Sequence, residues 1–550
     1  MQNIRAFFAG AAAAILFSTM SINCRTKPAA VAVPDSSRAE AQAAEYVSQG
    51  DARFLDSHLY GWRQAEAMYD KAYALHRSDA TREKLLLTRF LIMTRQMDED
   101  IPDPRLDETV KELCENPAGE RGAMLCALAQ KYREGIWLKT AAGEPARKFK
   151  VDRAWFGGTE SSVGAYLYSF CARAGILANP PEGLEEAAER LKDSPLFIYL
   201  DFPRKGAQKL AEIEKTNPQF AELYDYMGEG LFQKRRYNGA RAYFRKAIGL
   251  IPEYLRSLNG LGNVYSFALE DYETAIEYYD AVLKIQPLNT AALFGKGSAL
   301  HNLGRYEESN AALVSMLETD LWRKGYASAN NVNYYQGEGR HLQAYNHYLM
   351  KNRVRARDLV DDAKRFLPES EEVNYLSGLL FFEENNLEEA REDFLRVVRR
   401  GGSNCSAMRY LGIIYRQKKG ETETRTAADD RMPSGGEYDK FRKEMDRRFP
   451  ESEQGEKRAL NYFLSSCDCM EKATHALSDQ IKMIPAMDLE ESEKVILKGK
   501  VEKKLLDYRL SSDSMIESMV KMASADRVEG KDVYVKLMND ILTRIRLANP

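Results

Sequence analysis

The feature that most constrains the fold is a glycine that recurs at a nearly constant interval in the middle of the chain. Gly228, Gly262 and Gly297 are separated by 34 and 35 residues. The small residues that follow them in the same register are Ala240, Ala275 and Ser309. Segments of this length form single supersecondary units whose apolar faces need neighbours, so the pattern predicts an array of stacked units.

Each unit has the pattern of two consecutive helices. The best-defined units are 221–254, 255–289 and 290–323, and Pro252 and Pro287 close the first two. The glycine lies on the first helix and the small residue on the second, which lets the two helices approach closely. Proline ends the second helix because it has no backbone N–H to donate.

These units resemble the tetratricopeptide repeat, with the glycine as the eighth residue and the small residue as the twentieth. The resemblance implies an all-α fold, an α-solenoid of helical hairpins. Two features depart from the pattern: one extra residue in the second unit near 268–271, and Lys296 in the apolar seam of the third.

Weaker copies extend the array in both directions, and a helical C-terminal segment is predicted to cap it. The predicted segments are degenerate helical hairpins at 41–134, a loop at 135–164, repeat-like helices at 165–220, the array at 221–416 with further units at 337–370, 371–404 and from 405, a polar insertion at 417–457, and the cap at 458–550. Within the cap, breaks are expected near Pro485 and Ser511.

The first residues have the pattern of a targeting segment. Arg5 precedes an apolar stretch at 6–22, and Cys24 follows it. The pattern resembles a bacterial lipoprotein signal at 1–23, with Cys24 as the lipid-carrying residue and 24–40 as a flexible tether. An uncleaved membrane anchor and a plain secretory signal are the alternatives. All three place the chain outside the cytoplasm, in the cell envelope for the lipidated form.

Charge and motifs narrow the class of function. A net charge of -3 gives no basic field for nucleic acid. The sequence has no His-Glu-x-x-His, no Gly-x-Ser-x-Gly and no phosphate loop, so we expect no enzyme activity. The six histidines show no metal-ligand spacing, so no metal and no other cofactor is expected.

Six cysteines remain beyond the signal. An even number permits disulfides in an oxidising compartment without establishing them. Cys114 and Cys126 could face each other across a helical hairpin, whereas Cys467 and Cys469 would point apart on one helix. The favoured interpretation is that the cysteines are small buried apolar residues.

The loop at 135–164 does not fit the repeat pattern. Long loops inside helical arrays often carry function, which makes Trp155 and Phe156 candidate anchors of a binding loop. The alternative, which we favour, is an ordinary insertion whose aromatic residues pack on neighbouring helices.

A groove is the other candidate surface. In tetratricopeptide proteins, residues of the first helices line a concave groove that binds peptides. The corresponding candidates here are Asp225, Glu229, Gln233, Asn259, Asn263, Phe267, Phe294, Ser298, His301 and Asn302. Asn259 and Asn263 are four residues apart, so both amides are expected on one face, where they would bind an extended peptide backbone.

Three functions remain open at this stage. The leading hypothesis is a lipid-anchored envelope scaffold that binds a protein or peptide. The second is an obligate accessory subunit of an envelope transport, secretion or assembly complex. The third is a small-ligand binder or enzyme built on the 135–164 loop. Repeat folds serve unrelated tasks, so the sequence alone does not name the partner.

Overall fold

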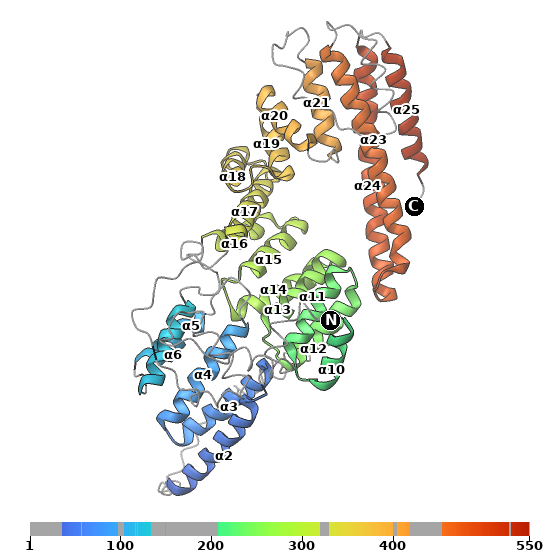
Figure 1. Cartoon of the computed structure of the whole chain (residues 1–550). Helices are drawn as coiled ribbons and strands as arrows, with labels where there is room; N and C mark the ends of the chain where they lie inside the picture. Colours follow the sequence, from blue (N-terminus) through green and yellow to red (C-terminus); the bar gives the residue numbers. More distant parts are fainter. Residues whose placement is uncertain are drawn as a thin grey trace, which may run out of the picture.

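The computed structural model describes residues 36–56, 58–96, 104–115, 117, 119–133, 149, 207–318, 329–399, 404–417, 454–526 and 530–548. Throughout these ranges the secondary structure is helical, apart from an isolated bridge residue at Phe149, and the helices stack as hairpins (Figure 1). The all-α solenoid is therefore confirmed. The predicted signal with Cys24, the loop candidates Trp155 and Phe156, and residues 418–453 of the insertion predicted at 417–457 lie outside the described residues.

The helices form four groups along the chain. The N-terminal group comprises α2 (Ser36–Phe54), α3 (Leu59–Leu75), α4 (Asp79–Gln96), α5 (Pro104–Glu115) and α6 (Gly119–Arg133). A single helix, α10 (Ala207–Thr216), precedes the array. The array comprises α11 (Ala221–Gln233), α12 (Tyr237–Leu250), α13 (Leu255–Asn263), α14 (Tyr272–Ile285), α15 (Thr290–Asn302), α16 (Tyr306–Leu317), α17 (Ala329–Leu349), α18 (Arg353–Phe366), α19 (Glu371–Glu383), α20 (Leu387–Arg399) and α21 (Cys405–Gln417). The C-terminal group comprises α23 (Gln454–Met483), a 3₁₀ turn (Ile484–Ala486), α24 (Glu491–Ala525) and α25 (Lys531–Leu547).

The first two repeats are each held by a large side chain that lies between two glycines. A Cβ added to Gly228 would lie 2.7 Å from the Phe244 ring, and one added to Gly260 in the next unit would lie 2.6 Å from the same ring. Tyr279 lies in the same way between Gly262 and Gly295, at 2.6 and 2.5 Å. The glycine at the eighth position admits the ring of its own unit, and the glycine at the sixth admits the ring of the preceding unit.

The later units use the same position with other partners. Gly378 receives Phe394, whose far side stacks on Tyr410 of the next unit at 5.2 Å between ring centroids. In the sixth unit the second helix is the first part of α23, because Gly412 receives Phe463. The second helix of this unit thus follows the insertion, at the start of the segment predicted as the cap.

The extra residue of the second unit is accommodated as a π-helical turn at Val264–Ala268. The π-turn holds one more residue than an α-turn, so the flanking helices keep their register. The chain then turns through Glu270, which has a φ of 50°. Phe267 lies in this turn and is 65% exposed.

The α23–α24 hairpin, which we call the C-terminal hairpin, returns from the end of the array to its first units (Figure 1). The Asp488 carbonyl accepts a hydrogen bond from Asn238 N at 2.9 Å, and the Asp488 carboxylate accepts one from Gly239 N at 3.1 Å. Arg241, whose side chain is 5% exposed, donates to Glu493 Oε2 at 3.0 Å. These contacts place the tip of the hairpin on the start of α12.

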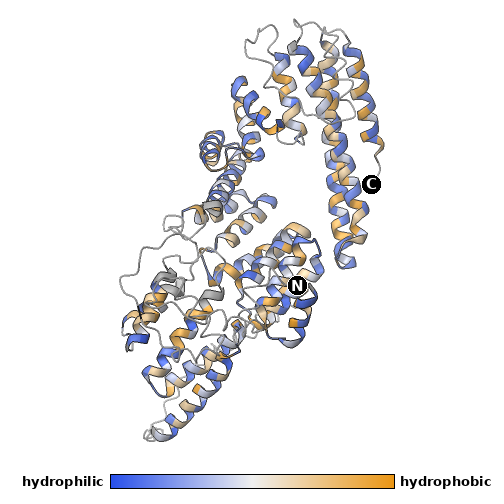
Figure 2. Ribbon diagram, viewed as in Figure 1, coloured by the Kyte–Doolittle hydropathy of each residue, from blue (hydrophilic) through white to orange (hydrophobic). Residues whose placement is uncertain are grey.

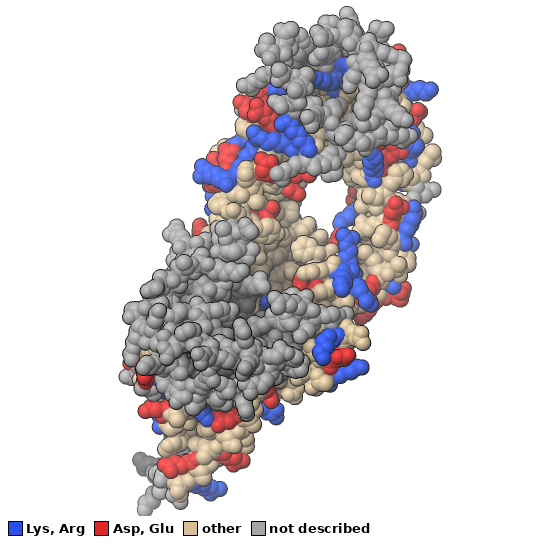
Figure 3. Space-filling model, in the orientation of Figure 1, with Lys and Arg blue, Asp and Glu red and all other residues tan. Residues whose placement is uncertain are grey.

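A second set of contacts joins α24 to the α13–α14 turn. Lys500 Nζ donates to the carbonyls of Leu269 and Glu270 at 3.0 and 2.8 Å. Leu497 and Val501 share a buried core with Leu261 of α13. The array and the hairpin thereby form a closed ring, and Figure 3 shows the opening between them.

The N-terminal helices continue the solenoid across α11. Leu59 N, at the start of α3, donates to the buried carboxylate of Glu222 at 2.9 Å. Trp62 and Tyr254 belong to one apolar core that spans α3 to α6 and the first repeat. Figure 2 shows hydrophobic and hydrophilic residues alternating along the helices of the array.

Three features differ from the sequence predictions. Helix α2 begins at Ser36, inside the predicted tether. Helix α24 passes through Ser511 without a break, because Leu505, Ser512 and Ile516 continue one buried face. The break expected near Pro485, in contrast, agrees with the structure, where it is the 3₁₀ turn.

The third difference concerns the cysteines, four of which form disulfides rather than buried thiols. Cys114 and Cys126 join α5 to α6 with Cα atoms 5.0 Å apart, and Cys405 and Cys469 join α21 to α23 at 5.4 Å. Cys467 is a buried thiol, as the favoured interpretation expected, and burial raises its pKa. The spacing had indicated only that Cys114 and Cys126 could meet.

We predict that Gly262→Ala destabilises the protein by about 1 to 3 kcal/mol, because its methyl group would overlap the enclosed Tyr279 ring. The matched control is Gly249→Ala in α12, where nothing lies within 4 Å of the added Cβ. That change should stabilise the helix by about 0.5 to 1 kcal/mol. Urea denaturation followed by circular dichroism measures both. Equal changes in the free energy of unfolding for the two variants would contradict the role of the enclosed ring.

Candidate protein-binding surface

The first helices of the six units lie side by side and carry the predicted groove residues. These helices are α11, α13, α15, α17, α19 and α21. Sequence reasoning selected candidates only on the first three. The structure shows that they differ in exposure and in what they contact, so we describe them unit by unit.

In the first unit, Asp225 is a buried connection between repeats and not an open groove residue. It is 4% exposed, accepting a hydrogen bond from Ser257 Oγ at 2.7 Å and from Arg256 Nε at 2.9 Å. Burial raises the pKa of its carboxyl, and the charge of Arg256 opposes that rise. Glu229 accepts a hydrogen bond from Gln233 within α11 at 3.0 Å.

In the second unit the two asparagines serve the fold. Asn259 is 6% exposed and donates to Asn289 Oδ1 at 3.3 Å, so it too is not available to a peptide. Asn263 accepts a hydrogen bond from the Tyr279 hydroxyl at 2.8 Å. The expectation that both amides bind a peptide backbone is therefore corrected, and Phe267 is the exposed candidate of this unit.

In the third unit the candidates meet side chains of the following repeat. Phe294 contacts Tyr334 and Tyr335 edge to face, with ring centroids 5.9 and 5.8 Å apart. His301 Nδ1 lies 2.6 Å from Asn346 Oδ1. Asn302 donates to the Ser298 carbonyl at 2.9 Å within α15.

These contacts continue into a run of rings that sequence reasoning missed. We call this run the aromatic row, and it consists of Phe294, His301, Tyr334, Tyr335, His341, Tyr345, Tyr348, Tyr375, Phe382 and Tyr410. In its middle part, His301 lies tilted 5.5 Å from Tyr345, and Tyr345 stacks on Tyr348 at 6.3 Å between ring centroids. Tyr348, Phe382 and Tyr410 then pack against one apolar core, and Phe382 meets Tyr410 of α21 edge to face at 4.9 Å.

A signal for this row was present in the sequence. The groove positions are the second, fifth, ninth, twelfth and thirteenth residues of a unit. In the unit at 337–370 these are Glu338, His341, Tyr345, Tyr348 and Leu349. All five are at least partly exposed. This candidate surface therefore lies further along the array than the candidates on the first three units.

Hydrogen bonds and guanidinium groups fix the rings of the row. The Tyr348 hydroxyl donates to Glu383 Oε1 at 2.7 Å, and burial followed by this bond raises its pKa, so the phenol stays neutral. Arg353 pairs with the same carboxylate and lies 4.0 Å from the centre of the Tyr348 ring. Arg409 lies 4.6 Å from the Tyr410 ring. Such a surface offers flat apolar area with hydroxyl and guanidinium donors at its edges.

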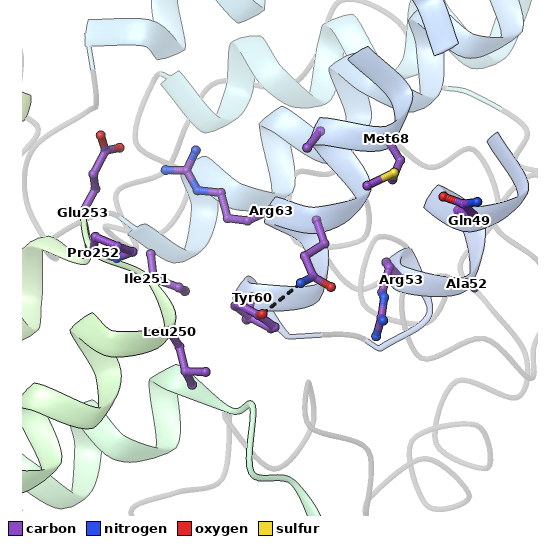
Figure 4. A pocket seen from close by; sticks show the side chains of 12 residues that line it. Gln49, Ala52, Arg53, Tyr60, Arg63, Met68, Leu250, Ile251, Pro252 and Glu253 are labelled. Atoms are coloured by element: carbon purple, nitrogen blue, oxygen red, sulfur yellow. Dashed lines mark hydrogen bonds between the residues drawn. The ribbon is translucent and has the colours of Figure 1, made fainter. Parts of the chain in front are cut away.

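A separate pocket of about 850 Å³ lies between α2, α3 and the end of α12 (Figure 4). Its lining includes Tyr60, Arg63, Met68 and Ile251. Gln64 donates to the Tyr60 hydroxyl at 2.9 Å. The described residues that line it include no cysteine, serine or histidine.

Two searches of the described residues bear on other functions. In these ranges no group of three or more His, Cys, Asp or Glu side chains is arranged to hold a metal ion. No helix within them combines the length and the apolar character needed to cross a membrane.

Comparison with known proteins agrees with the repeat pattern. A family model described as a tetratricopeptide repeat matches residues 265–317. A TPR repeat-containing protein of Methanocaldococcus jannaschii is 25% identical over 219 residues, 39% of this chain and 36% of that protein. A CTR9 homolog of Arabidopsis thaliana is 29% identical over 129 residues, 23% of this chain and 11% of that protein. The chain thus spans well under two thirds of the length of these relatives.

Solved structures with similar helices were also found. PilF of Pseudomonas aeruginosa superposes with a TM-score of 0.32 at 19% identity, covering 36% of this chain and 83% of that one. The APC/C hetero-tetramer Cut9–Hcn1 gives a TM-score of 0.35 at 12% identity, covering 93% and 87%.

We predict that Asp225→Ala destabilises the protein by about 2 to 3 kcal/mol, because it leaves the buried Ser257 hydroxyl and Arg256 without their acceptor. Phe267→Ala is the matched control on an exposed groove position and should change stability by less than about 0.5 kcal/mol. Thermal unfolding of both variants measures this. If Asp225→Ala leaves the stability unchanged, the structural role of Asp225 is wrong and it is again a candidate groove residue.

Proposed function

We propose that this chain, a tetratricopeptide-repeat protein, is a scaffold that holds an extended segment of a partner protein against the aromatic row. The observation that carries the proposal is the recurrence of ring contacts on four successive units, in three groups from Phe294 on α15 to Tyr410 on α21. Solenoids use such extended surfaces to bind other proteins. Aromatic residues bury large area at low entropic cost, which is why they are enriched where proteins meet.

The chemistry of the row indicates the kind of segment it fits. Arg409 lies beside Tyr410, and Arg353, which is paired with Glu383, lies beside Tyr348, so guanidinium groups border the row. Neutral phenols provide donors and acceptors for a peptide backbone. We therefore expect an extended segment with apolar or proline side chains spaced by two residues and a carboxylate near the arginines.

We further propose that the protein works in a cell envelope, tethered through a lipid on Cys24. Two observations support this location: the lipoprotein-like pattern of residues 1–23, and the two disulfides, which persist in oxidising compartments. An obligate accessory subunit of an envelope complex is the alternative with the same location. The two differ in whether the partner dissociates.

Site-specific photocrosslinking tests the binding surface. We predict that benzoylphenylalanine in place of Tyr345 captures one dominant partner in native membranes. Val354 on α18, which is 77% exposed, provides the matched control position off the row. A further variant combines the crosslinker at position 345 with Tyr348→Ala. The amount of crosslinked partner should fall by about tenfold, because one aromatic anchor is lost. Equal labelling at 345 and 354 would contradict a site on the row.

Detergent partitioning tests the tether. The wild-type chain should enter the detergent phase, and Cys24→Ser should move at least about tenfold towards the aqueous phase, because a single acyl chain contributes about 0.8 kcal/mol per buried methylene. Mass spectrometry of the N-terminus then identifies the lipid. If Cys24→Ser partitions like wild type, residues 6–22 act as an uncleaved anchor and the lipid tether is wrong.

A further inference from the structure

A chain of hydrogen bonds between the third and fourth units holds His301, one of the rings of the aromatic row. Its Nδ1 lies 2.6 Å from Oδ1 of Asn346 on α17. The amide nitrogen of Asn346 lies 2.9 Å from Ser309 Oγ and 2.8 Å from Asn310 Oδ1 on α16. Ser309 Oγ in turn lies 2.7 Å from the carbonyl oxygen of Gly297. Asn346 and Ser309 are both fully buried, so water does not compete for these bonds.

This chain determines which ring nitrogen of His301 carries the hydrogen. A carbonyl oxygen only accepts, so the Ser309 hydroxyl donates to Gly297. Because that hydrogen is used, Asn346 donates to Ser309, and its amide oxygen faces His301. That oxygen also only accepts, so Nδ1 of His301 is the donor. In the neutral ring Nε2 is then a hydrogen-bond acceptor.

The acceptor nitrogen lies at the surface of the row. Among the described residues no group bonds to Nε2 of His301, and this atom is not buried. Tyr306 and Tyr345 flank the ring with centroids 5.7 and 5.5 Å away, so its orientation is restricted. His301 therefore presents one acceptor in a fixed direction.

A departure from the repeat pattern creates this arrangement. The position of Ser309 holds Ala240 and Ala275 in the two preceding units. Alanine has no hydroxyl, so neither of those units can form a bond like that of Ser309 with Asn346. The serine keeps the small size that the hairpin needs and adds the group that orients Asn346.

We infer that Nε2 of His301 accepts a hydrogen bond from a backbone N–H of the bound segment. The inference rests on the proposed function of the aromatic row. A segment pressed against the rings loses water from its backbone, and a buried N–H without an acceptor weakens binding. An acceptor that is already oriented meets this need at low entropic cost. The residue of the segment opposite His301 is therefore not proline, which has no N–H.

Two replacements of similar shape separate binding from folding. His301→Asn places an amide nitrogen near the position of Nδ1, which keeps the bond to Asn346 and removes the outer acceptor. His301→Gln places its amide near the position of Nε2, which keeps an acceptor and gives up the bond to Asn346. Thermal unfolding should therefore show His301→Gln to be the less stable of the two variants.

Capture of the partner should rank the two variants in the opposite order. The full chain carries benzoylphenylalanine in place of Phe382, on α19, and is crosslinked in native membranes. His301→Asn should lower the amount of crosslinked partner by about tenfold, and His301→Gln by less than about threefold. If His301 served only the fold, capture would instead follow stability.

Replacement of single amides by esters identifies the donor. The probe is a synthetic peptide with the sequence of the crosslinked segment, in which an ester oxygen replaces each backbone N–H in turn. One ester should weaken binding to the wild type by about tenfold and to His301→Asn by less than about twofold, as fluorescence anisotropy measures.

The outcomes distinguish this inference from the function on which it rests. If no ester couples to His301, or if His301→Asn captures as much partner as the wild type, the inference is overturned and the row remains a binding surface. If crosslinkers at 345 and 382 both capture no partner, the proposed function and the inference are overturned together.

Discussion

A single large side chain enclosed between two helical glycines is the contact on which the array depends. Phe244 and Tyr279 each lie between a glycine of their own unit and a glycine of the next. Each ring therefore determines two distances at once: the separation of the helices in a hairpin, and the separation of neighbouring hairpins. Because interiors are close-packed, neither distance can change without displacing a ring. The remaining contacts between units, such as Asp225 with Ser257, form on surfaces already aligned by these rings.

The same rings position the C-terminal hairpin. Phe244 belongs to the apolar core that receives Leu497 and Val501, so the site where α24 docks depends on the packing of the first two units. The π-turn at Val264–Ala268 contributes the carbonyl-bearing turn that Lys500 reaches. An inserted residue that looks like a departure from the repeat is thus part of the surface that closes the ring.

Sequence alone predicted the fold class and the role of the eighth-position glycines, because a 34-residue register specifies helix contacts directly. The groove was predicted less well. Position in the repeat indicated which residues face the groove side, but Asp225 and Asn259 are buried against partners 31 and 30 residues further along the chain, Arg256 and Asn289. The return of α24 to α12 was beyond reach, since it joins segments about 250 residues apart through pairs such as Arg241 and Glu493, and no local pattern relates them.

The two ends of the C-terminal hairpin are attached by different kinds of bond. At the α21 end, Cys405 and Cys469 make a covalent link, whereas the tip is held by hydrogen bonds, ion pairs and apolar contacts. Any detachment must start at the tip, and the hairpin would then move as an arm about a fixed hinge. The opening in the ring would widen and close again on the same surface of α12. A detached tip would leave the ring open on one side while the disulfide still linked the hairpin to α21.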